Sequence, residues 1–357
     1  MTPRFGPTLH AVLGDLWLDG RTTLCVPDAT RPLAVAPALE ALRPHLACSP
    51  TVVVGLGLHR QMTAKERAPL ADWQPIEHNP DDTVPTAQVD GIPGAVARAV
   101  AEAHQTIGIG VVELHQYAGV SGGHKAVAVG CGGRATLAAL HARERVLAPG
   151  VRVGQVAGNP FRAAIDRLGE AAGCRAALVW IPDLGLWGYG EPTALIAEAA
   201  ARIEPFEASP RRYTDAILTV PAAKGRTLYQ ASRAATYLAL SPNPPLLPGA
   251  TLRIHAPMNE GLGDEAGFVA ALASQRPPWR TYLSGPEPKG AGAQRAVMLA
   301  LLAQQYTLEV WGCENPKPFL DVGIFATTAR PTVSPDTLVV SQPFHRIPQW
   351  VEPSREG

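Results

Sequence analysis

Along the first half of the chain, short runs of β-branched residues alternate with alanine-rich stretches, and this alternation constrains the fold more than any other feature. It is typical of an α/β fold, in which crossover helices connect parallel strands. The expected strands are Thr23–Val26, Thr51–Val54, Ile107–Val112 and Ala177–Ile181. The expected helices are Ala36–Leu46, Ile92–Ala103, Ala135–Arg145 and Pro160–Ala172. We therefore predict a Rossmann-like parallel sheet in this part of the chain.

A domain boundary is predicted near residue 210, because apolar periodicity stops over Glu207–Tyr213 and turn residues and charges gather there. Beyond it the pattern resumes with an expected strand at Ala216–Val220, an expected helix at Tyr229–Leu240 and an expected strand at Ala250–His255. We predict an N-terminal α/β domain over residues 1–209, a second α/β domain over 210–330 and an extended, proline-rich tail over 331–357.

The composition favours a globular protein with a small-molecule partner. Apolar residues make up 46% of the 357 residues and charged residues 17%, which is enough to bury a large core. Lys plus Arg and Asp plus Glu number 31 each, so nothing indicates a nucleic-acid or membrane-surface partner. The five cysteines are scattered without a C-x-x-C pair, and the N-terminus lacks the apolar core of a secretory signal. We expect a reducing compartment, the cytoplasm.

Polar loops follow three of the predicted strands directly. The first leads to Asp28 and Arg31, the second to His59, and the third to His115 and on to Lys125. Ligands of open α/β sheets bind beyond the carboxyl ends of the strands. If these strands are parallel neighbours, the five side chains converge on one crevice.

Each of these residues has a functional and a structural interpretation. Arg31 offers a planar fork for a carboxylate or phosphate, and Asp28 could orient it or accept a hydrogen bond from a cofactor hydroxyl; both could instead form a surface ion pair. His59 and His115 could act as acid and base in alternation on opposite faces of a substrate, because imidazoles titrate near neutral pH. They could equally be core or capping residues.

The glycine-rich turn Ser121–Lys125 does not have the spacing of a phosphate-binding P-loop. It is either a structural turn or a site in which Lys125 holds a cofactor covalently. Downstream, the imidazole of His141 could complete the square-planar coordination of a Ni(II) ion whose other ligands belong to an organic cofactor. Without such a cofactor, His141 would be a half-buried packing residue of an alanine- and leucine-rich helix.

In the second half, Tyr229 and Arg233 are expected on one helical face, where a hydroxyl and a guanidinium could bind a carboxylate together. An ordinary amphipathic helix would show the same pattern. Trp279 and Trp311 are candidate aromatic walls of a binding site.

Several of these motifs together resemble the lactate racemase family, whose members use a nickel-pincer nucleotide. The resemblance covers roughly residues 20 to 265, and its most specific part is the string His115-Gln-Tyr-Ala-Gly-Val-Ser-Gly-Gly-His-Lys125. The other matching segments are Asp28–Arg31, Gly57–Arg60, Gly130–His141, Gly158–Pro160, Tyr229–Gln230 and Glu260–Gly263.

The resemblance implies a role for each matching position. Lys125 would carry the nickel-pincer nucleotide covalently and His141 would ligate its nickel, and the other cofactor-binding positions would be Asp28, Ser121, Gly122 and Gly123. His59 and His115 would be the catalytic acid–base pair. The substrate-binding positions would be Arg31, Tyr229, Gln230 and Arg233. The cofactor would lie in a cleft between two α/β domains, the first of them the cofactor-binding domain.

The implied activity is the interconversion of stereoisomers of a small 2-hydroxy acid through a 2-keto acid, with hydride passing to the cofactor and back. The implied partners are this substrate and the enzymes that build the cofactor and insert its nickel. The chain departs from the family at position 233, where Arg stands in place of the usual Lys, and at position 124, where His replaces the common Arg. These changes bear on the identity of the 2-hydroxy acid.

Three other functions fit the same residues less well. An NAD-dependent 2-hydroxy acid dehydrogenase lacks its G-x-G-x-x-G fingerprint in the first βα unit. A metal hydrolase lacks an H-x-x-x-H or H-x-H pair. A catalytically silent nickel-pincer nucleotide-binding protein is disfavoured by the presence of both His59 and His115.

Overall fold

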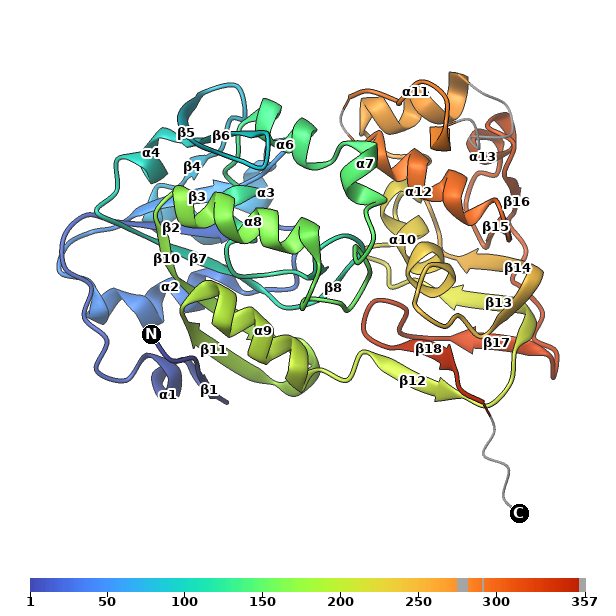
Figure 1. Cartoon of the computed structure of the whole chain (residues 1–357), viewed down its shortest axis with the longest axis horizontal. Helices are drawn as coiled ribbons and strands as arrows, with labels where there is room; N and C mark the ends of the chain where they lie inside the picture. The colour runs from blue at the N-terminus through green and yellow to red at the C-terminus, as the bar shows by residue number, and fades with distance from the viewer. Residues whose placement is uncertain (275–281, 291, 353–357) are drawn as a thin grey trace, which may run out of the picture. The chain divides into compact units, whose positions relative to one another are not determined.

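The structure is a computed structural model, and it describes residues 1–274, 282–290 and 292–352 (Figure 1). These residues divide into two compact units, Met1–Ile203 and Glu204–Gly357. Each unit has mixed α/β structure, so the predicted fold class is confirmed. Trp279 lies outside the described residues.

The main sheet of the first unit is built from β1 (Arg4–Gly6), β2 (Thr22–Pro27), β3 (Thr51–Gly55), β4 (Ile76–Glu77), β7 (Gln105–Val111), β10 (Cys174–Ile181) and β11 (Leu186–Gly190). Among the described residues its order is β1-β11-β10-β7-β2-β3-β4. The strands from β10 to β4 are parallel, and β11 and β1 are antiparallel additions at one edge. The four strands that the sequence predicts are therefore confirmed and lie side by side in the parallel part.

The remaining elements of this unit are two hairpins and a set of mostly short helices. The hairpins are β5 (Thr83–Val89) with β6 (Ile92–Ala97), and β8 (Leu114–His115) with β9 (Gly119–Val120). The helices are α1 (Leu9–Leu13), α2 (Val35–Leu42), α3 (Ala64–Arg67), α4 (Arg98–Ala101), α5 (Lys125–Ala128), α6 (Arg134–Leu140), α7 (Arg143–Val146), α8 (Pro160–Ala171) and α9 (Pro192–Arg202). Short 3₁₀ turns occupy Arg43–His45, Ala68–Trp73 and Pro182–Leu184.

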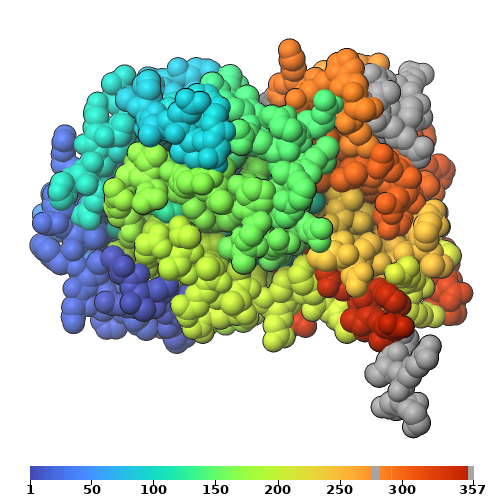
Figure 2. Space-filling model, viewed as in Figure 1, coloured from blue at the N-terminus to red at the C-terminus, as the bar shows by residue number. Residues whose placement is uncertain are grey.

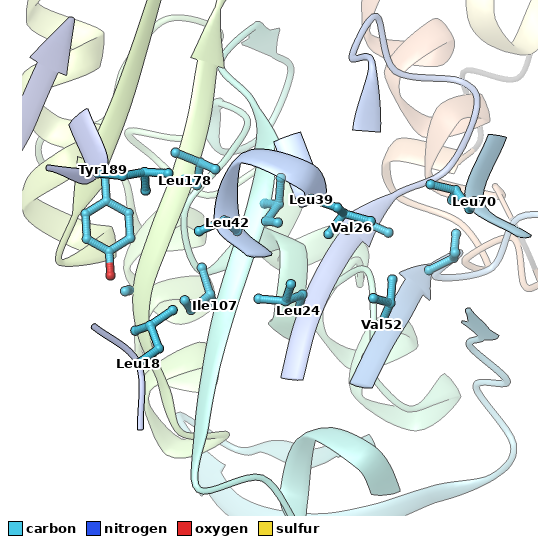
Figure 3. Packing of buried hydrophobic residues seen from close by; sticks show 14 of the residues in the cluster. Leu18, Leu24, Val26, Leu39, Leu42, Val52, Leu70, Ile107, Leu178 and Tyr189 are labelled. Atoms are coloured by element: carbon cyan, nitrogen blue, oxygen red, sulfur yellow. The ribbon is translucent and has the colours of Figure 1, made fainter. Parts of the chain in front are cut away.

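Both faces of the parallel sheet are buried, which explains why its strands are apolar throughout rather than alternating. Leu24 of β2 packs in one cluster with Leu39 and Leu42 of α2, and Figure 3 shows these side chains meeting. Cys25, the next residue along β2, packs in a cluster on the other face with Val127 of α5. Successive side chains of a strand point to opposite faces, so one strand serves both clusters.

Helices α8 and α9 cover the sheet on the side that faces the viewer in Figure 1, and in Figure 2 their yellow-green side chains form much of that surface. α8 begins as the sequence predicts. The side chain of Asn159 accepts hydrogen bonds from the N–H groups of Phe161 and Arg162, and Pro160 occupies the first turn. Its buried face packs against α5 and β10.

The predicted helix over Ile92–Ala103 is wrong, because most of this segment forms strand β6 and only Arg98–Ala101 is helical. Asp90 and Gly91 adopt φ values of 48° and 76° and turn the chain back onto β5. Two consecutive positive φ values are the signature of a tight hairpin turn that favours an Asp-Gly pair. The predicted helix over Ala135–Arg145 is also corrected, since it divides into α6 and α7 at His141.

The second unit contains β12 (Phe206–Ser209), β13 (Tyr213–Thr219), β14 (Leu246–His255), β15 (Thr307–Trp311), β16 (Phe325–Thr327), β17 (Thr337–Val340) and β18 (Ile347–Trp350). Its helices are α10 (Leu228–Ala239), α11 (Ala266–Ser274), α12 (Gln294–Leu302) and α13 (Lys317–Asp321). In the described part of this unit, a five-stranded parallel sheet has the order β16-β15-β14-β13-β17, and β12 pairs with β18.

The segment 331–357, which the sequence predicts to be an extended tail, supplies β17 and β18 to the second unit. Its β-branched and aromatic residues, Thr337–Val340 and Ile347–Trp350, form ladder hydrogen bonds with β13 and β12. A proline-rich segment can still hold strands where its prolines lie between them or at a sheet edge. None of the described helices is both long and apolar enough to cross a membrane.

Candidate active site at the carboxyl ends of the parallel strands

In the first unit, the side of β2 on which successive strands join the sheet changes after β4. From β2 the chain builds the sheet outward through β3 and β4, and it then returns to add β7 and β10 on the other side of β2. β2 and β7 are therefore neighbours whose following loops leave in opposite directions. Such a switch point, at the carboxyl ends of parallel strands, is where open α/β sheets bind ligands.

Asp28 and His59 meet in the loops that follow β2 and β3. Nδ1 of His59 lies 2.7 Å from Oδ2 of Asp28, and the Asp28 side chain is only 8% exposed. Oδ1 of Asp28 accepts hydrogen bonds from the backbone N–H of Thr30 at 3.1 Å and from its hydroxyl at 2.5 Å.

Burial alone would raise the pKa of Asp28. The hydrogen bonds from His59 and Thr30 and the nearby charge of Arg31 outweigh burial, so its pKa lies well below the ordinary value. An ionised Asp28 accepts only, so Nδ1 of His59 is the donor of their hydrogen bond. The other ring nitrogen of the neutral imidazole, Nε2, then carries the lone pair.

Arg31 pairs with a buried carboxylate that the sequence analysis missed. Nη1 of Arg31 lies 3.6 Å from Oε2 of Glu113, whose side chain is 3% exposed. Glu113 follows β7, two residues before His115, and its place beyond a strand end is the signal that could have found it. The contact joins the loop after β2 to the loop after β7 at the switch point.

Ser121 holds the backbone around Glu113. Its hydroxyl donates to the carbonyl of Val111 at 2.5 Å and accepts from the N–H of Glu113 at 3.0 Å. Its own N–H donates to the Glu113 carbonyl at 2.8 Å. The structure therefore gives Ser121 a definite role in fixing the loop, and a contact with a cofactor stays a prediction.

His115 lies at the end of β8, and its Nδ1 accepts hydrogen bonds from the N–H groups of Tyr117 at 3.3 Å and Ala118 at 3.1 Å. The Tyr117 ring lies edge-on between two imidazoles. Its centroid is 5.8 Å from that of His115 and 5.9 Å from that of His141. The structure thus links two sequence-predicted histidines through one aromatic side chain.

His141 ends α6 instead of lying within a longer helix. Its Nδ1 donates a hydrogen bond to the carbonyl of Leu137 at 2.9 Å, and its ring centroid lies 5.3 Å from that of Phe161. Because Nδ1 is the donor, Nε2 is the nitrogen that carries the lone pair. Metal-ligating histidines are commonly oriented by such a bond to a backbone carbonyl.

Lys125 begins α5 after two glycines that adopt positive φ values, 89° at Gly122 and 63° at Gly123. Larger side chains do not fit there, since a Cβ at Gly123 would lie 2.6 Å from Cγ1 of Ile196. A buried arginine that the sequence analysis missed, Arg162, donates from Nη1 to the carbonyl of Gly122 at 3.2 Å. The turn before Lys125 is therefore held from α8.

Close backbone contacts place α5 directly on the sheet. If Gly108 of β7 carried a Cβ, that atom would lie 3.0 Å from the carbonyl oxygen of Gly123. A Cβ added to Gly55 of β3 would lie 2.9 Å from Cα of Gly130. The N–H of Gly57 donates to the Gly130 carbonyl at 2.8 Å. The glycines in these strands thus let the Lys125 segment pack against the loop that leads to His59.

His124 packs away from these groups. His124 is 2% exposed, and a Cβ added to Gly169 of α8 would lie 2.5 Å from the Cβ of His124. Burial lowers the pKa of His124, which favours the neutral imidazole. At this position, where the resemblance leads one to expect Arg, the chain has a buried packing residue.

In the second unit, the predicted face of α10 is confirmed. Cζ of Arg233 lies 5.7 Å from the ring centroid of Tyr229, and the ring of Tyr229 packs edge-on against Phe268 at 5.4 Å. The backbone N–H of Gln230 is capped by the hydroxyl of Thr227 at 3.3 Å. Tyr229 is 7% exposed, so its ring is part of the core of this unit.

The Glu260–Gly263 segment lies against the beginning of α10, where the N–H groups of Leu228 and Tyr229 donate to the carbonyls of Gly261 and Leu262. Trp311 ends β15, and its Nε1 donates to Glu309 at 2.8 Å. This hydrogen bond gives Trp311 a structural partner, and its role as an aromatic wall stays a prediction.

Residues 18–154 match the family model of the lactate racemase N-terminal domain. No curated protein sequence matches the chain. Among solved structures, the chain is similar to the lactate racemase apoprotein from Thermoanaerobacterium thermosaccharolyticum, with a TM-score of 0.80 and 16% identity over 95% of this chain and 91% of that one. It is also similar to a Thermotoga maritima protein, with a TM-score of 0.72 and 14% identity over 96% of both chains. The matched segment of the chain is therefore similar to the lactate racemase N-terminal domain, and the chain has the fold of the solved lactate racemase apoprotein.

Proposed function

We propose that this protein is a racemase or epimerase of a small 2-hydroxy acid and that it works with a covalently held nickel-pincer nucleotide. The observation that carries the proposal is the arrangement at the switch point. There, an imidazole oriented by a buried carboxylate lies in the same cluster of loops as a guanidinium. This arrangement suits a substrate that has both a carboxylate and a hydroxyl.

The residues of the first unit fit the cofactor. Only one protein ligand is needed to complete a square-planar nickel whose other ligands are organic, and Nε2 of His141 has the lone pair for it. The backbone before Lys125 is shaped by glycines where a Cβ would collide with Ile196. Lys125 would hold the nucleotide and His141 would ligate the nickel. When bound, the group supplies a hydride acceptor, which no protein side chain provides.

Arg31 would bind the substrate carboxylate. A guanidinium has five N–H donors in a planar fork, so the contact with Glu113 leaves other donors of Arg31 for a second carboxylate. Glu113 would act as a positioning residue that keeps the fork in one orientation. Asp28 adds a further negative charge that interacts with Arg31.

His59 and His115 would act on the substrate hydroxyl. The C2–H of a 2-hydroxy acid is not acidic enough for an imidazole to remove it as a proton, whereas the hydroxyl proton can pass to a nitrogen lone pair. Loss of this proton, together with the C2 hydrogen and its electron pair as a hydride, would leave a flat 2-keto acid. Return of the hydrogen to the other face inverts the centre. The protein positions the substrate and moves the proton.

Tyr229, Gln230 and Arg233 would contact the substrate and the cofactor from the second unit. Support comes from the placement of the Arg233 guanidinium against the Tyr229 ring on one helical face. Arg233 keeps the positive charge of the expected Lys but is bulkier and planar. This favours a larger or dicarboxylic 2-hydroxy acid.

The proposed cofactor implies particular partners and a location in the cell. The partners would be enzymes that build the nucleotide and insert its nickel, and the location would be the cytoplasm. All five cysteines lie among the described residues and are free thiols, which supports a reducing compartment.

The test is to produce the protein together with the enzymes that build the cofactor, and then to measure its intact mass and its action on single enantiomers of 2-hydroxy acids. We expect a covalent adduct and inversion of at least one acid. Lys125→Ala should lack both the adduct and the inversion. Lys65→Ala, which removes an exposed lysine from α3, is the matched control and should retain both.

Two outcomes would contradict the proposal. An absorbance change that depends on added NAD, in protein without an adduct, would favour a dehydrogenase. An adduct without conversion of any 2-hydroxy acid would favour a catalytically silent nucleotide-binding protein.

A further inference from the structure

We propose that His78, a histidine that the sequence analysis did not single out, is a positioning residue for the cofactor. Its imidazole holds the segment 129–133, here called the linker, which joins α5 to α6. The identity of the group that is positioned rests on the proposed function above. The contacts that carry the proposal all lie within the first unit.

The linker connects the two residues that would hold the cofactor. α5 begins at Lys125 and ends at Ala128, and α6 begins at Arg134 and is followed by His141. The imidazole of His141 would have to reach the nickel of a group whose other end is fixed at Lys125. Metal–ligand distances vary by only about 0.2 Å in working sites. The path of the linker therefore bears directly on whether both residues can serve one group.

His78 lies at the carboxyl end of β4, and its backbone N–H donates to the carbonyl of Val54 in β3 at 3.0 Å. The residue is 5% exposed, and its Nε2 lies 2.9 Å from the carbonyl oxygen of Gly132. A carbonyl oxygen only accepts, so Nε2 is the donor and Nδ1 carries the lone pair. The side chain of His78 therefore ties the linker to β4.

The surroundings of His78 suit a fixed donor and not a group that exchanges protons. Burial lowers the pKa of His78, and the hydrogen bond with Gly132 offsets only part of that effect. Its Nδ1 is buried and has no hydrogen-bond partner among the residues that the structure describes. A second proton at Nδ1 would have no acceptor there, so the neutral imidazole is favoured.

The neighbouring carbonyls of the linker are held by backbone groups. The carbonyl of Gly130 accepts from the N–H of Gly57 at 2.8 Å, and the carbonyl of Cys131 accepts from the N–H of Ala97 at 2.9 Å. The carbonyl of Gly132 accepts from a side chain instead. A substitution at position 78 can therefore remove this one attachment and leave the backbone attachments in place.

The linker also packs directly on α5. A Cβ added to Gly130 would lie 2.4 Å from the carbonyl oxygen of Ala126, and one added to Gly132 would lie 2.3 Å from the carbonyl oxygen of Ala128. Because the two backbones are this close, a shift of the linker is transmitted to the helix that begins at Lys125.

The loop after His78 contacts the start of α6 as well. The N–H of Arg134 donates to the carbonyl of Pro80 at 2.9 Å, and its guanidinium donates to both carboxylate oxygens of Asp81 at 2.6 Å. The side chains of this ion pair are 55% and 59% exposed, and exposed ion pairs contribute little. We therefore expect the buried bond from His78 to be the stronger side-chain attachment.

Hydrogen–deuterium exchange of the cofactor-free protein tests the attachment itself. His78→Leu removes the donor, leaves the buried Gly132 carbonyl unsatisfied, and should speed exchange of the linker amides about tenfold. His78→Gln, whose amide N–H can take the place of Nε2–H, should restore most of the protection. His78→Asn repeats the comparison with a polar side chain that is too short to reach Gly132, and it should exchange like His78→Leu.

His45→Leu is the matched control, because Nδ1 of His45 makes the same kind of hydrogen bond to the carbonyl of Leu16 at 2.8 Å. It should leave exchange of the linker unchanged. Linker exchange at the wild-type rate in both His78→Leu and His78→Asn would overturn the proposal.

Nickel retention by the cofactor-loaded protein tests the positioning. Intact mass should show the same adduct on wild type and on His78→Leu, because Lys125 itself is unchanged. During dialysis against a chelator, nickel should leave His78→Leu roughly ten times faster, a size typical of losing a group that orients a metal ligand. His78→Gln and His45→Leu should retain nickel as wild type does.

The control excludes a general loss of stability as the cause, since His45→Leu also loses a hydrogen bond between an imidazole and a carbonyl. Equal nickel retention in His78→Leu and wild type would overturn the positioning role. So would a His78→Gln protein that loses nickel as fast as His78→Leu.

Failure of this proposal and failure of the proposed function are distinguishable. A wild-type protein without an adduct would contradict the proposed function and, with it, a role of His78 toward the cofactor. Wild-type protein with adduct and nickel, together with a His78→Leu protein that retains both equally well, would contradict only the role of His78.

Discussion

Replacing Arg162 of α8 by methionine should destabilise the first unit strongly. Arg162 is 1% exposed, and its Nε and Nη2 donate to the two carboxylate oxygens of Asp166 at 3.1 and 2.7 Å. Its Nη1 donates to the Gly122 carbonyl in the turn before Lys125. Methionine fills a similar volume but leaves both acceptors without this donor.

The expected size of the effect follows from burial. Removing one partner of a buried ion pair costs about 3–5 kcal/mol. The Asp166 side chain is 13% exposed, so water can reach it in part, and the lower end of that range applies. The carboxylate and the carbonyl that lose a donor both contribute to this cost, and a buried unsatisfied group costs about 1–3 kcal/mol. We therefore expect Arg162→Met to lower the free energy of unfolding by about 3 kcal/mol.

Equilibrium unfolding in urea measures this change. Arg167→Met is the matched control, because Arg167 lies on the same helix, is 53% exposed and pairs with Asp90 at the surface. It should change stability by less than about 0.5 kcal/mol. Adding Asp166→Ala to Arg162→Met should restore about 1–2 kcal/mol by removing the uncompensated carboxylate. If Arg162→Met matches the control, or the double variant shows no recovery, the inferred role of this pair is wrong.

Three further predictions concern acid stability, the hairpin turn and the thiols. The depressed pKa of Asp28 stabilises the fold above the ordinary carboxyl pKa and ceases to do so as pH falls through the folded value. In thermal melts, Asp28→Asn should therefore be less stable than wild type at about pH 7, and this difference in stability should shrink below about pH 4. A difference that stays the same at both pH values would contradict the reasoning. Gly91→Val should cost roughly 1–2 kcal/mol in urea unfolding, since φ is 76° there, and an unchanged midpoint would contradict the turn assignment. Cys48 is the exposed thiol, so Ellman's reagent should titrate one thiol quickly in native protein and all five in urea; two fast thiols would contradict the burial of the other four.

The strands of the first unit could be predicted because burial on both faces leaves a plain signal. β2, β3, β7 and β10 are continuous apolar runs bounded by turn residues, and such runs are typical of central parallel strands. The hairpin strand β6 was mistaken for a helix because Ala95–Ala101 alternates alanine with valine and arginine, which suits either structure. The Asp90–Gly91 pair, with the alternating residues before it, was the signal that distinguished the two.

The positions of the site residues could be predicted in outline from the order of strands and loops. Asp28, His59 and His115 follow strands that proved to be parallel neighbours. The contacts of Arg31 with Glu113 and of Arg162 with Gly122 could not be predicted, because no motif marks which of the side chains will meet. The hydrogen bonds that set the tautomers depend on turn geometry, which a sequence does not specify residue by residue.

The racemase function is tested most directly by the fate of hydrogen at C2. A single enantiomer of a 2-hydroxy acid, deuterated at C2, would be incubated with the cofactor-loaded protein in ordinary water. The product enantiomers would then be separated by chiral chromatography, and their molecular masses would be measured by mass spectrometry. Transfer as hydride to a bound acceptor and back predicts the opposite enantiomer with its deuterium retained. An inverted product in which hydrogen from water has replaced the deuterium would contradict the account, and so would the absence of inversion with every 2-hydroxy acid tried.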